Sequence, residues 1–287
     1  MARRLSDRIS RYYRRDVVTV GEEASAIKTL DLMNRTMMNT VYVVDNRKPV
    51  GFINSMHASH WLISRKLFLK PLSKVKASDI MDQYMENDPR IVRKRQTIRT
   101  AAQVMIDRDL DELPVVDSHG DIIGRITLWD LLRGVESRLD GNLRVKNFAT
   151  DEFVSCEETH SLYYLICQLP LTTTRAVIVK DNSGAPAGII FKDALDCVSQ
   201  MLRCRQRATW RGSCGLPGGF PVPAIAFLTA EEIMSRSFIE VKEDDYLKSV
   251  IDLMVQMKTE VYPVVDDSGK LVKVVTAREI IRRLLLS

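Results

Sequence analysis

One short pattern occurs four times in this chain of 287 residues. In each copy an apolar segment ends at an aspartate, a polar turn follows, and a second apolar segment comes after the turn. Self-similarity at intervals of this size indicates that one supersecondary unit has been duplicated. We therefore expect four copies of one unit, whose anchoring aspartates are Asp45, Asp117, Asp181 and Asp266.

The second copy, LPVVDSHGDIIGRITLWDLL, shows the pattern most clearly. Leu113–Val116 and Ile122–Ile126 are apolar runs of strand length, and the residues between them, Asp117–Gly120, favour a tight turn. Thr127 and Asp130 then begin an apolar segment that is typical of a helix start. We predict a β-hairpin followed by a helix.

A short strand and a helix are also predicted before each hairpin. Apolar residues recur there every three or four positions, which is the spacing of one helix face. We interpret the methionines on this face as core residues rather than as a redox or metal site. The face comprises Ile27, Leu30, Met33 and Met37 in the first copy, Ile98, Ala101, Ala102 and Met105 in the second, and Leu247, Val250, Ile251 and Met254 in the fourth.

The junction between the second hairpin and its helix carries the most suggestive chemistry. A hydroxyl at Thr127 and a carboxylate at Asp130 could both contact one ligand beside the helix start, where anions are favoured. A carboxylate accepts hydrogen bonds from two hydroxyls, so a sugar diol with a phosphate would suit the pair. The same spacing also fits a capping box, with aspartate where glutamate or glutamine is usual. Both interpretations stay open, and one residue can serve both.

The second copy resembles the signature of the cystathionine-β-synthase (CBS) domain, LPVVD-x-x-G followed by G-x-hydrophobic-T-x-x-D. The residues that carry the resemblance are Leu113, Pro114, Val115, Val116, Asp117, Gly120, Gly124, Thr127 and Asp130. It implies an α/β fold of four α+β CBS units, paired into two Bateman modules. Four repeats also make the chain similar to the gamma subunit of AMP-activated protein kinase.

The repeats imply the following domain organisation. A stretch rich in glycine and proline, which lacks periodicity, is expected to be a linker or exposed loop between the third and fourth repeats. Repeats 1 and 2 are expected to pair as one module, and repeats 3 and 4 as the other. The predicted boundaries are 1–72 for repeat 1, 73–143 for repeat 2, 144–202 for repeat 3, 203–224 for the loop and 225–287 for repeat 4.

The resemblance implies a nucleotide site in some repeats but not in all. In repeat 2 it implies that Thr127 contacts phosphate or ribose and that Asp130 binds the 2′ and 3′ hydroxyls. In repeat 4, Thr276 and Glu279 fill the equivalent places and Lys273 replaces a glycine, so that site is expected to be altered. Asn54 and His57 stand there in repeat 1, and Phe191 and Ala194 in repeat 3, whose site is expected to be empty.

Other residues are candidates for the remainder of the ligand. The adenine is expected to lie against the loop before the first strand and the residues before LPVV, where a backbone edge with apolar sides can recognise a purine. The phosphate-facing candidates are Asn54, His57, His60, Arg125 and Lys273, and the adenine-facing candidates are Pro89, Arg90, Leu110 and Asp111.

The sequence favours a regulatory binding protein over an enzyme. It shows no Ser-His-Asp set, no glycine-rich phosphate loop and no paired cysteines for a metal, so no catalytic residue, metal or cofactor is expected. There is no apolar run of the ~18 residues that span a bilayer, which favours a cytoplasmic protein without membrane contact. The expected ligand is an adenine nucleotide, AMP, ADP or ATP.

Two alternatives belong to other classes of function. The ribose-binding carboxylate would also suit a sensor of S-adenosylmethionine. The protein could instead be an interaction scaffold with vestigial clefts. In that case its arginine-rich start, which is expected to form an exposed helix, would dock a partner. Nucleic-acid binding is not favoured, because no basic stripe with interleaved aromatic residues appears elsewhere. An unidentified regulated protein and a face-to-face homodimer are the other expected partners.

Overall fold

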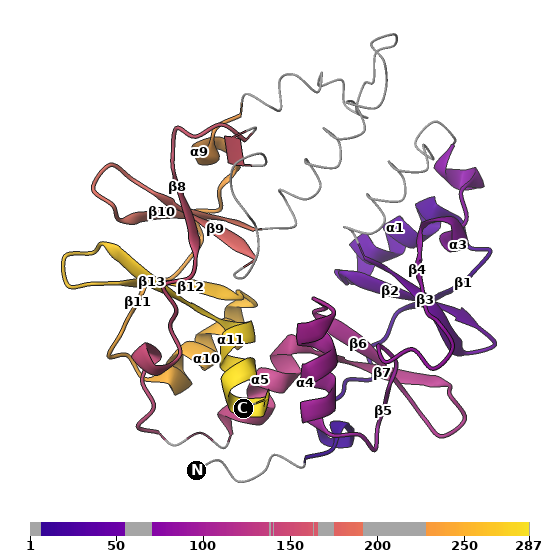
Figure 1. Cartoon of the computed structure of the whole chain (residues 1–287). Coiled ribbons are helices and arrows are strands. Elements are labelled where there is room, and N and C mark those ends of the chain that lie inside the picture. Colours follow the sequence, from indigo (N-terminus) through magenta and orange to yellow (C-terminus); the bar gives the residue numbers. More distant parts are fainter. Residues whose placement is uncertain are drawn as a thin grey trace. The chain divides into compact units, whose positions relative to one another are not determined.

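A computed structural model describes residues 7–54, 71–137, 139, 141–162, 164–165, 175–191 and 228–286. His57, His60, Ala194 and the predicted loop 203–224 lie outside these residues. The chain forms two compact units, each containing two repeats (Figure 1). One comprises the chain up to Ser137 together with the segment from Ile281, and the other runs from Arg138 to Ile280. The expected pairing of repeats 1 with 2 and 3 with 4 is therefore confirmed.

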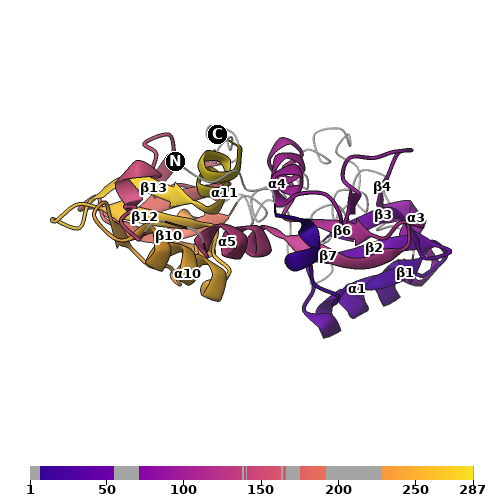
Figure 2. The ribbon, with the colours of Figure 1, turned by 90° about the horizontal axis from the view of Figure 1, so that it is seen from below.

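The first unit contains two sheets, with strand orders β1-β2-β3-β4 and β5-β6-β7. In Figure 2, α1 and α4 are seen on opposite sides of these strands. The elements of repeat 1 and the connection to repeat 2 are the 3₁₀ helix η1 (Ile9–Arg11), β1 (Thr19–Gly21), α1 (Ala26–Thr36), β2 (Thr40–Asp45), β3 (Lys48–Asn54), the 3₁₀ helix η3 (Leu72–Lys74), α3 (Ala77–Ile80) and β4 (Asp82–Gln83). They are followed by β5 (Val92–Arg93), α4 (Ile98–Asp107), β6 (Glu112–Val116), β7 (Ile122–Thr127) and α5 (Leu128–Glu136), and the π-helix η5 (Arg282–Leu286) completes the unit.

The second unit contains the sheets β10-β9-β8 and β11-β12-β13. In every repeat the second strand is antiparallel to the third, which confirms the predicted hairpin, and the first strand is parallel to the second. The elements are the 3₁₀ helix η4 (Val145–Asn147), β8 (Val154–Glu157), β9 (Ala176–Lys180), β10 (Pro186–Phe191), α9 (Ala230–Ile233), β11 (Val241–Lys242), α10 (Leu247–Met257), β12 (Val261–Val265), β13 (Leu271–Thr276) and α11 (Ala277–Ile281).

The anchoring aspartates of repeats 2, 3 and 4 hold their hairpin turns. The Asp117 carboxylate accepts hydrogen bonds from the backbone amides of His119 at 2.8 Å and Asp121 at 3.1 Å, and Gly120 supplies the positive φ of +85°. Asp181 and Asp266 make the same contacts in their own turns. A short polar side chain that satisfies turn amides explains why the aspartate recurs.

The predicted helix faces are confirmed in repeats 2 and 4 but only partly in repeat 1. All four predicted residues of α4 and of α10 are buried. In α1, by contrast, Ile27 is 50% exposed and Met37 is 87% exposed. The buried stripe of α1 runs through Ala26, Thr29 and the predicted Met33, so its first two residues each precede a predicted one, and the helix ends at Thr36. Met37 is the left-handed C-cap and leaves the core.

Within each unit, the leading segment of a repeat, the stretch before its first strand, pairs with the third strand of the other repeat. Arg14 and Arg125 exchange two backbone hydrogen bonds, each of 2.8 Å. The predicted exposed helix at the chain start is therefore wrong over residues 7–16, where Ile9 is buried in a short 3₁₀ turn and the chain then extends along β7. The corresponding pairs elsewhere are Asp82 with Phe52, Ser235 with Ile189, and Thr150 with Val274.

A glycine makes this close approach feasible in three of the four pairings. A Cβ at Gly124 would overlap the carbonyl oxygen of Arg14 and the ring of Tyr13. Gly51 and Gly188 are confined in the same way by methionine side chains. In repeat 4, Lys273 occupies this register, and the segment that pairs with it, the leading segment of repeat 3, carries Ala149 where that of the first repeat has Tyr13. The small alanine compensates for the added side chain.

We expect Gly124→Ala to lower the free energy of unfolding by about 1–3 kcal/mol, because the new methyl group meets backbone that cannot move aside without breaking the Arg14 pairing. Gly21→Ala is the matched control, since no atom lies within 4 Å of its added Cβ. Denaturant unfolding of the two variants measures the difference. Equal stability of both would contradict the proposed packing role of Gly124.

Candidate functional site

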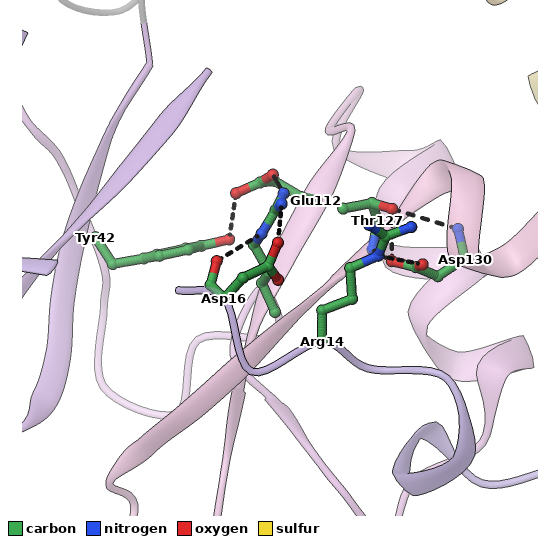
Figure 3. Close-up of polar contacts among 7 residues, drawn as sticks. Arg14, Asp16, Tyr42, Glu112, Thr127 and Asp130 are labelled. Atoms are coloured by element: carbon green, nitrogen blue, oxygen red, sulfur yellow. Dashed lines mark hydrogen bonds and ion pairs between the residues drawn. The ribbon is translucent and has the colours of Figure 1, made fainter. Parts of the chain in front are cut away.

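Thr127 and Asp130 lie at the junction of β7 and α5 and form a complete capping box (Figure 3). Thr127 Oγ1 accepts from the Asp130 amide at 3.3 Å, and Asp130 Oδ2 accepts from the Thr127 amide at 3.0 Å and its hydroxyl at 2.6 Å. Both residues are buried, with 6% and 4% exposure. The capping interpretation of this pair is therefore confirmed, and it leaves Oδ1 of Asp130 for another partner.

That partner is Arg14 of the first repeat. Its Nε donates to Asp130 Oδ1 at 2.8 Å, and its side chain is 35% exposed (Figure 3). The contact follows from the leading segment, since the backbone pairing of Arg14 with Arg125 brings the guanidinium to the start of α5. Each Asp130 oxygen thus has a donor, and a sugar diol at Oδ1 would have to replace an arginine.

A second polar network joins the same two repeats. The Arg125 guanidinium donates to Glu112 Oε2 at 2.6 Å and to Asp16 Oδ2 at 3.0 Å. The Tyr42 hydroxyl of β2 donates to Glu112 Oε1 at 2.9 Å (Figure 3). These bonds commit Arg125 to two carboxylates, so we assign it to the contact between repeats rather than to a phosphate.

Burial dominates the protonation of this network. It raises the pKa of Glu112 above the ordinary value, although the Arg125 charge and the Tyr42 hydrogen bond act in the opposite direction. Burial, with the nearby Glu112 charge, also holds the pKa of Tyr42 well above its usual range. Burial would lower the pKa of Arg125, but Glu112 and Asp16 outweigh it and the pKa is raised.

The equivalent junction of repeat 4 differs in its charges. Thr276 Oγ1 accepts from the Glu279 amide at 3.1 Å, whereas Lys273 pairs with Glu243 at 2.7 Å. Sequence reasoning missed two arginines beside this junction, because neither matches the repeated signature. These two side chains, Arg175 at 10% exposure and Arg278 at 9%, each lie 3.6 Å from a carboxylate oxygen of Glu260. Arg175 stands at the position where repeat 2 has Asp111. Aligning the second strands of the repeats could therefore have identified it.

The predicted equivalences between repeats agree with the strand register. Asn54 pairs with Thr40, and Phe191 pairs with Ala176, at the position where Thr127 pairs with Glu112. The Asn54 side chain is half-buried at the end of β3.

The adenine-facing candidates lie in the segments before β5 and β6. Arg90 donates to Asp88 at 2.6 Å, pairs with Asp82 at 3.0 Å and lies over the ring of Tyr84 at 5.0 Å. Arg90 is thus held by its own loop, and its contact with adenine stays a prediction. Pro89 and Asp111 are exposed and Leu110 is half-buried, and the Asp111 carbonyl accepts from the amide of Leu128 at the start of α5.

Two absences hold for the part of the chain that the structure describes. Within it, no group of three or more histidine, cysteine, aspartate or glutamate side chains is arranged to hold a metal ion. Within the same residues, every helix is too short or too polar to cross a bilayer.

We expect Arg125→Met to cost about 3–5 kcal/mol at pH 7, because it leaves the buried Glu112 carboxylate without its cation. The pKa of Glu112, already raised, should rise further. An acid whose pKa is raised in the folded state stabilises the fold at low pH and loses that contribution as pH rises. The deficit relative to the wild type should therefore shrink as the pH falls from 7 to 5.

Urea unfolding across this pH range measures the deficit. The control is the double variant Glu112→Gln, Arg125→Met, which has no buried carboxylate here and should show a deficit that is smaller and independent of pH. A single variant whose deficit stays constant from pH 7 to pH 5 would contradict this account of Glu112.

Comparison with known proteins supports the fold along the chain. Protein MJ1225 of Methanocaldococcus jannaschii is 23% identical over 276 residues, which cover 93% of this chain and 94% of that protein. Its crystal structure, described as that of a proposed archaeal homologue of g-AMPK, matches with a TM-score of 0.72 at 20% identity and covers 96% of this chain and 99% of that one. An uncharacterised conserved protein of Pyrococcus horikoshii matches with a TM-score of 0.59, 20% identity and the same coverage.

A partial match concerns an enzyme. A stretch of 124 residues is 27% identical to homoserine O-acetyltransferase of Methanobrevibacter ruminantium, and it covers 43% of this chain but only 25% of that enzyme. The model of the CBS domain family matches residues 9–63, 77–137 and 230–286, which correspond to the first, second and fourth repeats. These segments make up more than half of the sequence, and the chain belongs to the CBS domain family.

Proposed function

We propose that this protein is a non-catalytic, cytoplasmic regulator that binds AMP, ADP or ATP at Thr127 and Asp130 and passes the signal to a partner protein through a conformational shift. The observation that carries the proposal is the Asp130 carboxylate. It is buried at the start of α5, and the charge that balances it comes from another repeat. The resemblance of the surrounding residues to the nucleotide-binding CBS signature supports the same assignment.

The chemistry of the site suits a ribose. Oδ2 of Asp130 is held by Thr127 of the same cap, whereas Oδ1 is held by a partly exposed arginine side chain. A ribose hydroxyl can donate to Oδ1 in place of Arg14 without breaking the helix cap. The positive end of the α5 dipole then favours a phosphate nearby.

The same contact provides a route for signalling. Arg14 belongs to repeat 1 and Asp130 to repeat 2, so a ligand that replaces their ion pair changes what holds the two repeats together. A ligand shifts a conformational equilibrium only as far as its affinities for the two states differ. We propose that the regulated protein, or the second copy in a face-to-face homodimer, responds to this change.

A second candidate location is the junction of repeat 4. Thr276 and Glu279 keep the hydroxyl and the acid, and Arg175 and Arg278, both largely buried, place two guanidinium groups near Glu260. Guanidinium groups suit the oxygens of a phosphate. We extend the proposal to this altered site, with a phosphate near the arginines.

Calorimetry with AMP, ATP and S-adenosylmethionine tests the proposal on the wild type and Asp130→Asn. The asparagine keeps a carbonyl oxygen for the Thr127 amide, so the helix remains capped while the charge is lost. A charged hydrogen bond contributes about 1.5–3 kcal/mol, so AMP should bind at least about tenfold more weakly to the variant. Asp107→Asn, on the exposed side of α4, is the control and should bind AMP like the wild type.

Each result decides between classes of function. Equal AMP affinity in the wild type and Asp130→Asn would place the ligand elsewhere. No binding of any of the three compounds to the wild type would leave the interaction scaffold as the better description. Tighter binding of S-adenosylmethionine than of AMP would favour the sulfonium sensor.

A further inference from the structure

Among the described residues, one of the four pairings sets an arginine against an acid at the helix start. The position of Arg14 in the leading segments is occupied by Asp82, Thr150 and Ser235 in the other repeats. The acid that Arg14 meets is Asp130. Its equivalent in repeat 4 is Glu279, but the leading segment that pairs there has Thr150 in place of the arginine. The backbone pairing is shared by all four repeats, but the arginine and the carboxylate occur together at one site. The pairing itself therefore does not require this ion pair.

The backbone keeps the Arg14 guanidinium at this site even when its ion pair is broken. The backbone of Arg14 is fixed by its two hydrogen bonds with Arg125. It also packs directly against Gly124, where a Cβ would overlap the Arg14 carbonyl oxygen. Only rotation of the Arg14 side chain can move the charge, so it stays within reach of any ligand that occupies Asp130. Its 35% exposure leaves room for such a rotation toward solvent.

Charge balance then separates one ligand class from another. A neutral nucleoside that takes Asp130 Oδ1 replaces an ion pair with a neutral hydrogen bond and leaves the guanidinium without its anion. A nucleotide replaces the pair at Asp130 and supplies a phosphate for the guanidinium, which is a strong, bidentate combination. A cationic ligand, such as S-adenosylmethionine, places a second positive charge beside Arg14.

We propose that Arg14 is the specificity-determining residue of this site, because it occupies Asp130 in the absence of ligand and binds the phosphate of the nucleotide that displaces it. The inference rests on the proposed function and adds to it the selection of phosphorylated adenosine over adenosine and over S-adenosylmethionine. The ligand of this site must therefore carry both a ribose diol and a phosphate.

The test compares the affinities for AMP and adenosine by calorimetry. In Arg14→Gln, which keeps a long polar side chain without charge, adenosine should bind more tightly than to the wild type, and the preference for AMP should fall at least about tenfold. Arg15→Gln removes the same charge from the neighbouring, exposed position, where no ion pair is formed with any described residue, and should keep the wild-type preference.

A double variant guards against loss of folding, since Arg14→Gln leaves the Asp130 carboxylate unpaired. Asp130→Asn with Arg14→Gln removes both charges and should bind AMP and adenosine with similar affinity. An unchanged preference for AMP in Arg14→Gln or in the double variant overturns the role of Arg14. If Asp130→Asn alone still weakens AMP binding, the proposed function stands without it, whereas a failure of the wild type and Arg14→Gln to bind either compound overturns both.

Discussion

The pairing of each leading segment with the third strand of the other repeat is the interaction on which each unit depends. A three-stranded sheet of this size has open edges and little core of its own, and edges that stay unpaired invite non-native contacts. Exchanging the leading segments closes one edge of each hairpin and ties the two repeats together. The Arg14–Arg125 pairing also decides which side chains meet, because it brings repeat 1 to the start of α5.

This constraint explains several otherwise separate features of composition. Three glycines recur because the paired leading segment leaves no space for a Cβ at these positions, and Ala149 replaces a large residue where Lys273 breaks that pattern. Buried charges recur for a related reason. Glu112 and Arg125 meet where the two sheets of the first unit adjoin, and each is held by partners from both repeats. Such networks fix register when all their members are satisfied.

The local parts of the fold could be predicted from the sequence, because turns, caps and helix faces depend on residues close together in the chain. The hairpin turns, the capping box of Thr127 and Asp130, and the buried faces of α4 and α10 belong to this group. The Arg14–Asp130 contact could not be predicted, since its partners lie 116 residues apart and meet only through the exchanged segment. The face of α1 was misplaced because Ile27 and Met37 mimic the helical period although the buried stripe uses Ala26 and Thr29.

The exchange of segments also sets what a ligand at Asp130 can do. In a self-contained repeat, binding would affect that repeat alone, but here the carboxylate belongs to repeat 2 and its cation to repeat 1. The free energy available for signalling is the difference in ligand affinity between the arrangement with the ion pair and the arrangement without it. In the proposed site, an arginine that occupies Asp130 without ligand and donates to the incoming phosphate would make this difference depend on the charge of the ligand, which is the property that a nucleotide sensor has to measure.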